Sequence, residues 1–309
     1  MSQTQKPFSL NREACGKQVS ASFSLFVLAV LASVAAAAEP VRHAFLAADS
    51  RAGRVALVNE AGVVGWTCNA KDVCDATVLT DGSVLLSDRG GARIVSHDGR
   101  VLWDYRAPKE AEVYTCQMLP NGRVLVCEGG TKRLVEVDRA GKTVVEIALT
   151  TGVGVHGQFR IARKLPDGTY LVAFWKEGCV KEIAADGSVR RTIGGLGEAY
   201  MAQRLANGNT LIGCGDTHRV LEVDPAGAVV WEIKENDLPG HPLRFAAHVE
   251  RLANGNTIIC NWPGHGHEGK QPMLVEVTPQ KQVVWQFDGR DRFRGIIGFH
   301  LLDGIKTRP

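Results

Sequence analysis

The sequence has no strong excess of positive or negative charge, and it contains no dense run of basic residues. It has 309 residues, with 36 Lys and Arg against 33 Asp and Glu, and its formal net charge is +3. A nucleic-acid-binding domain normally carries a clustered basic surface, so we expect no nucleic-acid partner. After residue 40 no apolar run approaches the roughly 20 residues that a membrane-spanning helix needs, so we expect no membrane span in that part.

Familiar catalytic motifs are missing as well. The sequence contains no Ser nucleophile elbow, phosphate loop, dinucleotide fingerprint or HExxH pair. No helical periodicity of useful length follows residue 40, which excludes a helical bundle. No two cysteines stand in a CxxC pair, which excludes the commonest redox and zinc patterns. Sequence motifs therefore point to no enzyme class, and the sequence is more informative about fold.

The first 38 residues have the pattern of a secretory signal peptide. Lys17 precedes an apolar run at 23–34, and small residues in ASVAAAAEP follow it. We predict cleavage between Ala38 and Glu39, which leaves one domain at 39–309 in the periplasm or outside the cell. The alternative is a transmembrane anchor, for which the apolar run is short.

Seven cysteines follow the predicted cleavage point, and export would permit disulfides. Cys116 and Cys127 stand five residues to either side of Asn121-Gly122, so a bridge across that hairpin is one expectation. Cys68 and Cys74 flank a short connection and could also pair. The alternative is that most of these residues are small buried hydrophobes.

One stretch, RLANGNTLIGCGDTHRVLEVDPAGAVVWEI at 204–233, is repeated along the chain. It recurs at 251–287, and fainter copies run back to the start of the predicted domain. Each copy contains an Asn-Gly or Asp-Gly pair, which favours a hairpin between two antiparallel strands. These pairs stand at 81–82, 121–122, 167–168, 207–208, 254–255 and 303–304.

A second mark stands about 20 residues after each of the first five pairs and once before the first pair, and Trp66, Trp103, Trp231 and Trp285 share one phase of it. Six copies with a period of 40–49 residues indicate a propeller or solenoid, and we expect the tryptophans to pack between repeats. Three strands before the first complete copy and one after the last make up a sixth unit. The sequence therefore predicts an all-β, six-bladed β-propeller with four antiparallel strands per blade, closed by the C-terminal strand joining three N-terminal strands.

The Gly-x-x-x-Trp mark resembles the docking motif of pyrroloquinoline-quinone-type (PQQ-like) propeller repeats. The segment NWPGHGHEGKQPMLVEVTPQKQVVWQF is similar to exported bacterial proteins of that type, and the resemblance covers about residues 42–302. It implies strands A to D from the channel outward, with the D–A and B–C loops on one face and the Asn/Asp-Gly turns on the other. The quinone and calcium site of the longer, eight-bladed alcohol dehydrogenases has no counterpart that we can place, so PQQ is not expected as a cofactor.

The long D–A and B–C loops hold the candidate site residues, because variable loops on a rigid scaffold usually carry function. His265 and His267 form an H-x-H pair that could bind a divalent metal ion, although the sequence specifies no third ligand. We expect His156, His241, Trp262, His265 and His267 to converge in one cleft at the channel mouth. The candidate ligand-binding residues are His156, Trp175, His218, His241, Arg244, Trp262 and Glu268.

Each candidate also has a structural interpretation. Loop histidines often cap loops, Trp262 could fill the core under its loop, and His248 is expected to be a hydrogen-bonded residue that lines the channel. The leading functional hypothesis is an exported binding module for a small polar ligand, a glycan or a protein. The alternatives are a metal-assisted hydrolase, lactonase or lyase, in which a divalent ion polarises the substrate, and a quinone-dependent oxidoreductase.

Overall fold

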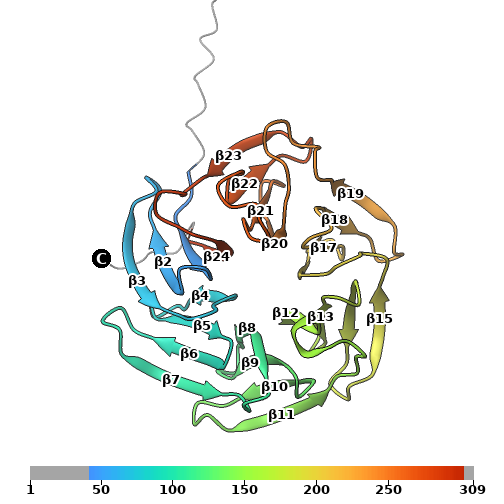
Figure 1. Ribbon diagram of the computed structural model, residues 1–309. Helices are drawn as coiled ribbons and strands as arrows, with labels where there is room; N and C mark the ends of the chain where they lie inside the picture. The colour runs from blue at the N-terminus through green and yellow to red at the C-terminus, as the bar shows by residue number, and fades with distance from the viewer. Residues whose placement is uncertain (1–41, 303–309) are drawn as a thin grey trace, which may run out of the picture. The chain divides into compact units, whose positions relative to one another are not determined.

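The computed structural model describes residues 42–302, which form a ring of six four-stranded sheets around a central axis (Figure 1). All neighbouring strands are antiparallel, so the predicted six-bladed β-propeller is confirmed. The predicted signal peptide at 1–38 and the turn at Asp303-Gly304 lie outside the described residues. Within 42–302, no helix has the length and apolar character needed to cross a membrane.

Each blade runs from an innermost strand at the channel to an outermost strand at the rim. In that order, the first three blades are β24 (Ile296–Leu301), β1 (Phe45–Asp49), β2 (Arg54–Val58) and β3 (Val64–Asn69); β4 (Ala76–Val78), β5 (Val84–Asp88), β6 (Gly91–Val95) and β7 (Val101–Arg106); β8 (Glu112–Met118), β9 (Val124–Gly129), β10 (Arg133–Val137) and β11 (Thr143–Ala148). The other three are β12 (Phe159–Lys164), β13 (Tyr170–Phe174), β14 (Cys179–Ile183) and β15 (Val189–Ile193); β16 (Met201–Arg204), β17 (Thr210–Gly213), β18 (Val220–Val223) and β19 (Val229–Ile233); β20 (Ala246–Arg251), β21 (Thr257–Asn261), β22 (Leu274–Val277) and β23 (Val283–Phe287).

The ring closes where the sequence predicts. Strand β24 is innermost in its blade and pairs with β1, with Phe45 opposite Leu301 and Ala47 opposite Phe299. This pairing ties the last described strand to the first and covers the inner edge of β1.

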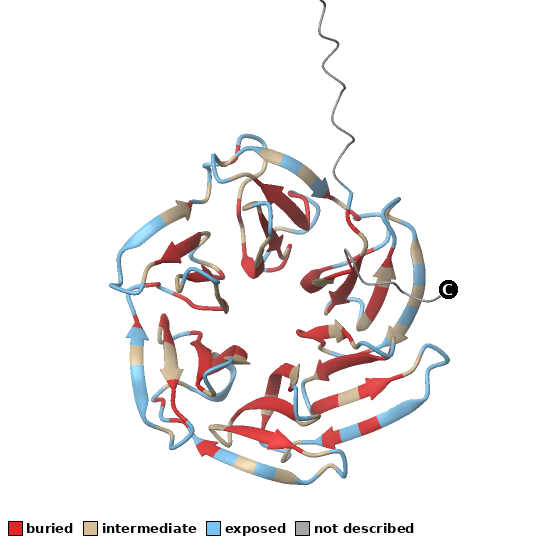
Figure 2. Cartoon of the chain, turned by 180° about the vertical axis from the view of Figure 1, so that it is seen from behind, coloured by how far each residue is buried: buried red, intermediate tan, exposed pale blue. Residues whose placement is uncertain are grey.

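The hydrophobic core lies between neighbouring blades. Inner strands are buried on both faces, whereas outer strands mostly alternate between partly buried and exposed residues (Figure 2). The in-phase tryptophans pack as expected, because Trp66, Trp103 and Trp231 each donate their indole N–H to a carbonyl in the next blade, at 2.8 to 2.9 Å. Arg191 occupies the same phase and makes the equivalent bond to the Asp224 carbonyl at 2.7 Å. These bonds dock each of these outer strands onto its neighbour.

The Asn/Asp-Gly turns are three-residue loops. In the first, Gly82 donates its N–H to the Leu79 carbonyl and has a φ of 84°, while Leu79 donates to the Ser83 carbonyl. A type I turn followed by a residue in the left-handed region has this geometry, which suits glycine. The loop therefore consists of residues 80–82, and the strand pairing is centred on Asp81. A two-residue loop centred between Asp81 and Gly82 would give a register that differs by one residue.

That shift explains why the expected disulfide across Asn121-Gly122 is wrong. Cys116 lies opposite Val126 rather than Cys127, and a one-residue slip turns side chains to opposite faces of the sheet. The two thiols accordingly pack in different inter-blade clusters. The second expected disulfide, between Cys68 and Cys74, is wrong too, because Cys68 lies on the outermost strand β3 and Cys74 lies at the channel. All seven cysteines of the described region are free thiols.

Candidate functional site

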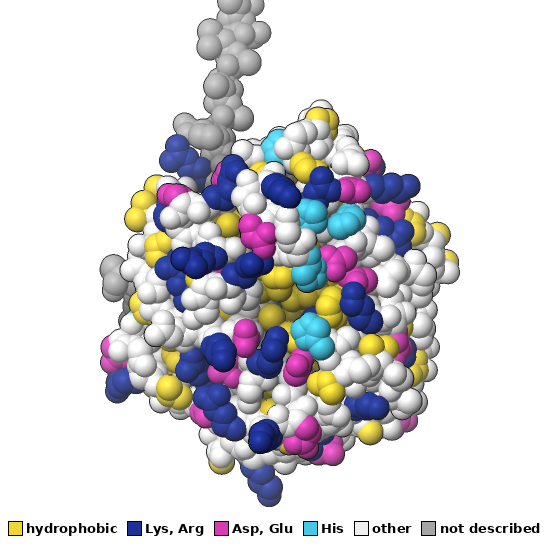
Figure 3. All heavy atoms as spheres, in the orientation of Figure 1, with side chains coloured by type: hydrophobic (Ala, Val, Ile, Leu, Met, Phe, Trp, Pro, Cys, Tyr) yellow, Lys and Arg dark blue, Asp and Glu magenta, His cyan; other side chains and the backbone are white. Residues whose placement is uncertain are grey.

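A cavity of about 420 Å³ occupies the channel mouth on the face of the D–A and B–C loops. Figure 3 shows this face, with hydrophobic side chains at the base of a hollow and histidine and basic side chains around it. The lining residues come from all six blades. They are Ser50, Arg51, Asp72, Cys74, Arg89, Tyr114, His156, Arg160, Trp175, Tyr200, Phe245, Trp262, His265 and Ile297.

Arg160 is the central charged group of the cavity. Its side chain is only 3% exposed, and its guanidinium carbon lies 3.6 Å from the centre of the Trp175 ring and 4.1 Å from the centre of the Tyr114 ring. Arginine stacks readily on aromatic faces, and the attraction strengthens when water is excluded. The sandwich therefore holds one cation among aromatic walls.

His156 sits at the edge of this cavity in the short 3-10 helix Val155–Gly157, with most of its side chain exposed. Its Nδ1 lies 3.0 Å from the Tyr114 hydroxyl and 3.1 Å from a Glu112 carboxylate oxygen, and Tyr114 donates to the same oxygen at 2.7 Å. Burial opposes ionisation of Glu112, but the hydrogen bonds from Tyr114 and His156 outweigh it and lower the Glu112 pKa. This triad fixes the orientation of the imidazole.

The opposite wall is built from Phe245, Trp262 and His265. Trp262 packs edge to face against Phe245 and His265, with ring centres 5.1 and 5.0 Å apart. His265 Nδ1 lies 2.9 Å from Asp216 Oδ1, which ties the 261–272 loop to the neighbouring blade. The indole N–H of Trp262 is buried and has no hydrogen-bond partner among residues 42–302.

A buried thiol forms part of the cavity floor. Burial raises the pKa of Cys74 to about 11, so this thiol stays protonated at neutral pH. Since the thiolate is the nucleophilic form, Cys74 contributes surface rather than nucleophilic chemistry.

The structure brings together four of the residues predicted from sequence, namely His156, Trp175, Trp262 and His265. The other five do not line the cavity, so the expectation that His241 and His267 converge with them is wrong. His241 bonds to the Pro239 carbonyl and to Gln286 on the outermost strand β23, because its loop runs along the rim.

The remaining predicted residues serve loop contacts. His218 Nδ1 bonds to the Arg244 carbonyl, Arg244 forms an ion pair with Glu235, and Glu268 forms one with Arg51. The rings of His218 and His267 lie 6.4 Å apart. Among residues 42–302 no three His, Cys, Asp or Glu side chains are grouped so that they could hold a metal ion. The metal role of His265 and His267 therefore stays a prediction without a third protein ligand.

Sequence reasoning overlooked Tyr114 and Arg160 on the inner strands β8 and β12, and Tyr200 immediately before the inner strand β16. Tyr114 precedes the turn glycine Gly122 by eight residues, and Arg160 and Tyr200 stand at the same distance from Gly168 and Gly208. Strands β8 and β12 have register shifts at Tyr114 and at Arg160–Ile161, and such bulges redirect a side chain. The spacing from the turn glycine is a sequence signal that could have identified these positions.

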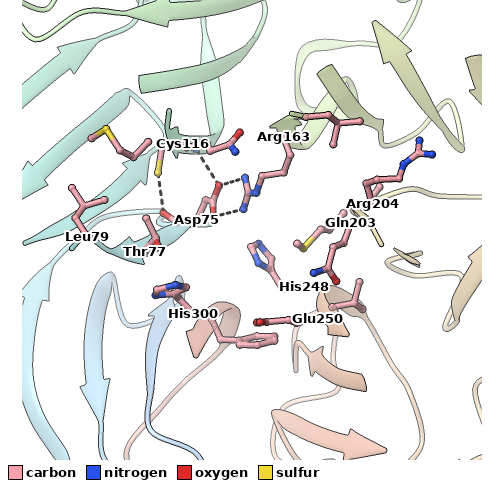
Figure 4. A pocket seen from close by; sticks show the side chains of 18 residues that line it. Asp75, Thr77, Leu79, Cys116, Arg163, Gln203, Arg204, His248, Glu250 and His300 are labelled. Atoms are coloured by element: carbon pink, nitrogen blue, oxygen red, sulfur yellow. Dashed lines mark hydrogen bonds and ion pairs between the residues drawn. The ribbon is translucent and has the colours of Figure 1, made fainter. Parts of the chain in front are cut away.

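A second cavity of about 430 Å³ lies at the other end of the channel, on the side of the Asn/Asp-Gly turns (Figure 4). Each blade contributes the inner-strand residue five positions before its turn glycine: Thr77, Gln117, Arg163, Gln203, Glu250 and Phe299. Asp75 accepts two hydrogen bonds from Arg163 across this cavity, at 2.7 and 2.9 Å. The ion pair cross-links blades on opposite sides of β8.

His248 lines this second cavity, as expected, but only part of its hydrogen-bonding capacity is used, because its buried Nε2 has no partner among residues 42–302. Burial lowers the pKa of His248 to about 4, with a further lowering by Arg163 that Asp75 opposes. Burial also lowers the pKa of the neighbouring His300.

We expect stability to fall as the pH drops from 6.5 towards 4. The folded pKa of His248 lies below its unfolded value of about 6.5, so the unfolded chain takes up the proton first and unfolding becomes more favourable. Between pH 6.5 and 5 this amounts to about 2 kcal/mol. Urea unfolding of the wild type and of His248→Gln across this range should show a shallower slope for the variant. Equal slopes would contradict the assignment.

The comparisons with known proteins agree with the fold. No family model and no curated protein matches the chain. A virginiamycin B lyase from Staphylococcus aureus, solved in a catalytically inactive form with quinupristin, is 12% identical with a TM-score of 0.56, covering 81% of this chain and 87% of the lyase. The WD40 propeller domain of Doa1 is 18% identical with a TM-score of 0.55, and 70% of each chain is covered. These two similarities concern the fold alone.

A protein of unknown function from Bacteroides caccae is much more similar. Its crystal structure matches with a TM-score of 0.79 and 30% identity, covering 86% of this chain and 100% of that one. Because the match includes the whole of that protein, the chain belongs to the same family of β-propellers as the Bacteroides caccae protein.

Proposed function

We propose that this propeller is an exported, PQQ-like binding module that takes a small polar ligand into the cavity at the channel mouth. The observation that carries the proposal is the cavity itself, about 420 Å³ in volume and lined by five large aromatic side chains around a few polar groups. Ligand sites typically have this size and this mixture of apolar walls with few directed polar groups. A glycan could use the same aromatic faces by stacking, and a protein could insert a side chain.

The rigidity of the walls supports the same conclusion. The Trp175 indole N–H donates to Glu198 at 2.8 Å, Tyr114 is held by Glu112, and Tyr200 packs edge to face on Phe245 with ring centres 5.1 Å apart. Preformed walls lower the entropy cost of binding, since fewer side chains must be ordered by the ligand. A cavity held in this way suits binding better than simple core packing.

A ligand-observed NMR screen with small polar molecules tests the proposal. His156→Ala changes a largely exposed cavity residue, and His97→Ala, an exposed histidine on the opposite face, is the matched control. We expect hits whose affinity changes at least severalfold in His156→Ala and is unchanged in His97→Ala. Hits that respond equally to both variants, or no hits at all, would contradict the proposal.

An enzymatic role is the second candidate, and the His156 triad is the observation that favours it. An imidazole held by a tyrosine hydroxyl and a carboxylate at the edge of a cavity has the geometry of a general acid or base. This would suit a hydrolase, lactonase or lyase. The metal-assisted form predicts a stoichiometric divalent ion in purified protein that is lost when His265 and His267 are both changed to Ala.

A further inference from the structure

Two arginines of the inner strand β12 differ in how their charge is balanced. Arg163 forms a two-point ion pair with Asp75. Arg160, three residues earlier, is as buried as a core residue and forms no ion pair with any residue at 42–302. Its polar contact within that range is one hydrogen bond, at 2.8 Å, from Nη1 to the carbonyl of Phe159. The fold therefore holds one buried guanidinium whose charge is not neutralised by a carboxylate.

Stacking offsets only part of the cost of that burial. A guanidinium has five N–H donors, and a charge removed from water is costly unless it is paired and hydrogen-bonded. The rings of Trp175 and Tyr114 stabilise the cation through its faces, but they leave the in-plane donors of Arg160 for other partners. An anion in the cavity would use those donors.

The other two arginines that line the cavity differ from Arg160. Arg51 is paired with Glu268, and Arg89, which forms no ion pair with residues 42–302, has its side chain exposed to solvent. The oxygen of Glu112 is engaged by Tyr114 and His156. Arg160 is thus the one buried lining arginine that lacks a counter-ion among residues 42–302.

We propose that the cavity binds a small planar organic anion, whose carboxylate or other oxyanion group meets the Arg160 guanidinium while its flat part lies against the aromatic walls. This rests on the proposed binding function and names its ligand class. Guanidinium groups match the geometry of oxyanions with two parallel hydrogen bonds. The walls of Phe245 and Trp262 provide apolar surface for an aromatic ring.

Isothermal titration with three matched probes tests the proposal: 2-naphthoate, 2-naphthyl sulfate and the neutral 2-naphthamide. We expect wild-type protein to bind at least one of the two anions about tenfold to a hundredfold more tightly than the amide. The preferred anion separates a carboxylate from a sulfate ligand. Arg160→Gln should remove the preference for the anion over the amide, whereas Arg100→Gln, at an exposed turn, should leave all affinities unchanged.

Equal or tighter binding of the amide by wild type would overturn the anion proposal, and so would unchanged anion affinity in a folded Arg160→Gln variant. The comparison of probes on wild type alone decides the matter if that variant does not fold. If the anion proposal fails, amide binding that is weakened by His156→Ala would still support binding in the cavity. Failure of all three probes to bind would also overturn the anion proposal, whereas the proposed function is judged by its own ligand screen.

Discussion

Deletion of residues 295–309 is expected to abolish the soluble monomer. The deletion removes β24, which is the innermost strand of the blade that also contains β1, β2 and β3. Ile296, Phe299 and Leu301 belong to a core cluster together with Phe45 and Ala47, so the loss would open both a sheet edge and an apolar interface. Exposed inner edges of this kind favour aggregation.

Size-exclusion chromatography and thermal melting of the purified protein measure this effect. The matched control ends at Leu302, so that β24 stays intact and only residues 303–309 are removed. We expect the control to elute as the full chain does and the longer deletion to be insoluble or aggregated. A deletion of 295–309 that melts with the full-length protein would show that the ring does not depend on β24.

Replacement of Asp75 by Ala is expected to cost about 3–5 kcal/mol of stability, because the partly buried Arg163 charge would lose its partner. Asp75 is 3% exposed and accepts a further hydrogen bond from the Cys116 backbone N–H at 3.0 Å, so the change would also leave a buried donor unsatisfied. Arg163 keeps part of its side chain in contact with solvent, which favours the lower end of the range.

Urea unfolding of the Asp75→Ala, Arg163→Met and double variants would measure the coupling between the two residues. We expect the double variant to be more stable than the sum of the single losses predicts, because it contains no unpaired charge. Additive losses, or a cost below about 1 kcal/mol for Asp75→Ala, would mean that the ion pair contributes little to the free energy of unfolding.

The repeat made the architecture predictable from the sequence. An Asn/Asp-Gly pair favours a hairpin through the conformation of only a few residues. The number of such pairs therefore gives the number of blades, and no long-range contact needs to be known. The phase of Trp66, Trp103 and Trp231 likewise identified the blade-docking position, because each repeat makes the same contact with its neighbour. Ring closure then followed from the number of strands at the two ends.

Loop residues of the site were predictable only in part. Loops after outer and second strands share one face, so His156, Trp175, Trp262 and His265 were correctly expected near the mouth. Whether a long loop turns inward or runs along the rim depends on its own contacts. His241 bonds to Gln286 on the outermost strand, and no spacing in the sequence encodes that choice.

The sequence by itself determined the number of blades, the order of strands and the face that carries the variable loops, because local turn chemistry repeated six times specifies them. Tertiary structure alone decided which side chains meet in the cavity. A one-residue register shift reverses the face of a strand, which separated Cys116 from Cys127, and the bulges of β8 and β12 turned Tyr114 and Arg160 towards the mouth. The stacking of Arg160 between rings from different blades exists only once the ring has closed.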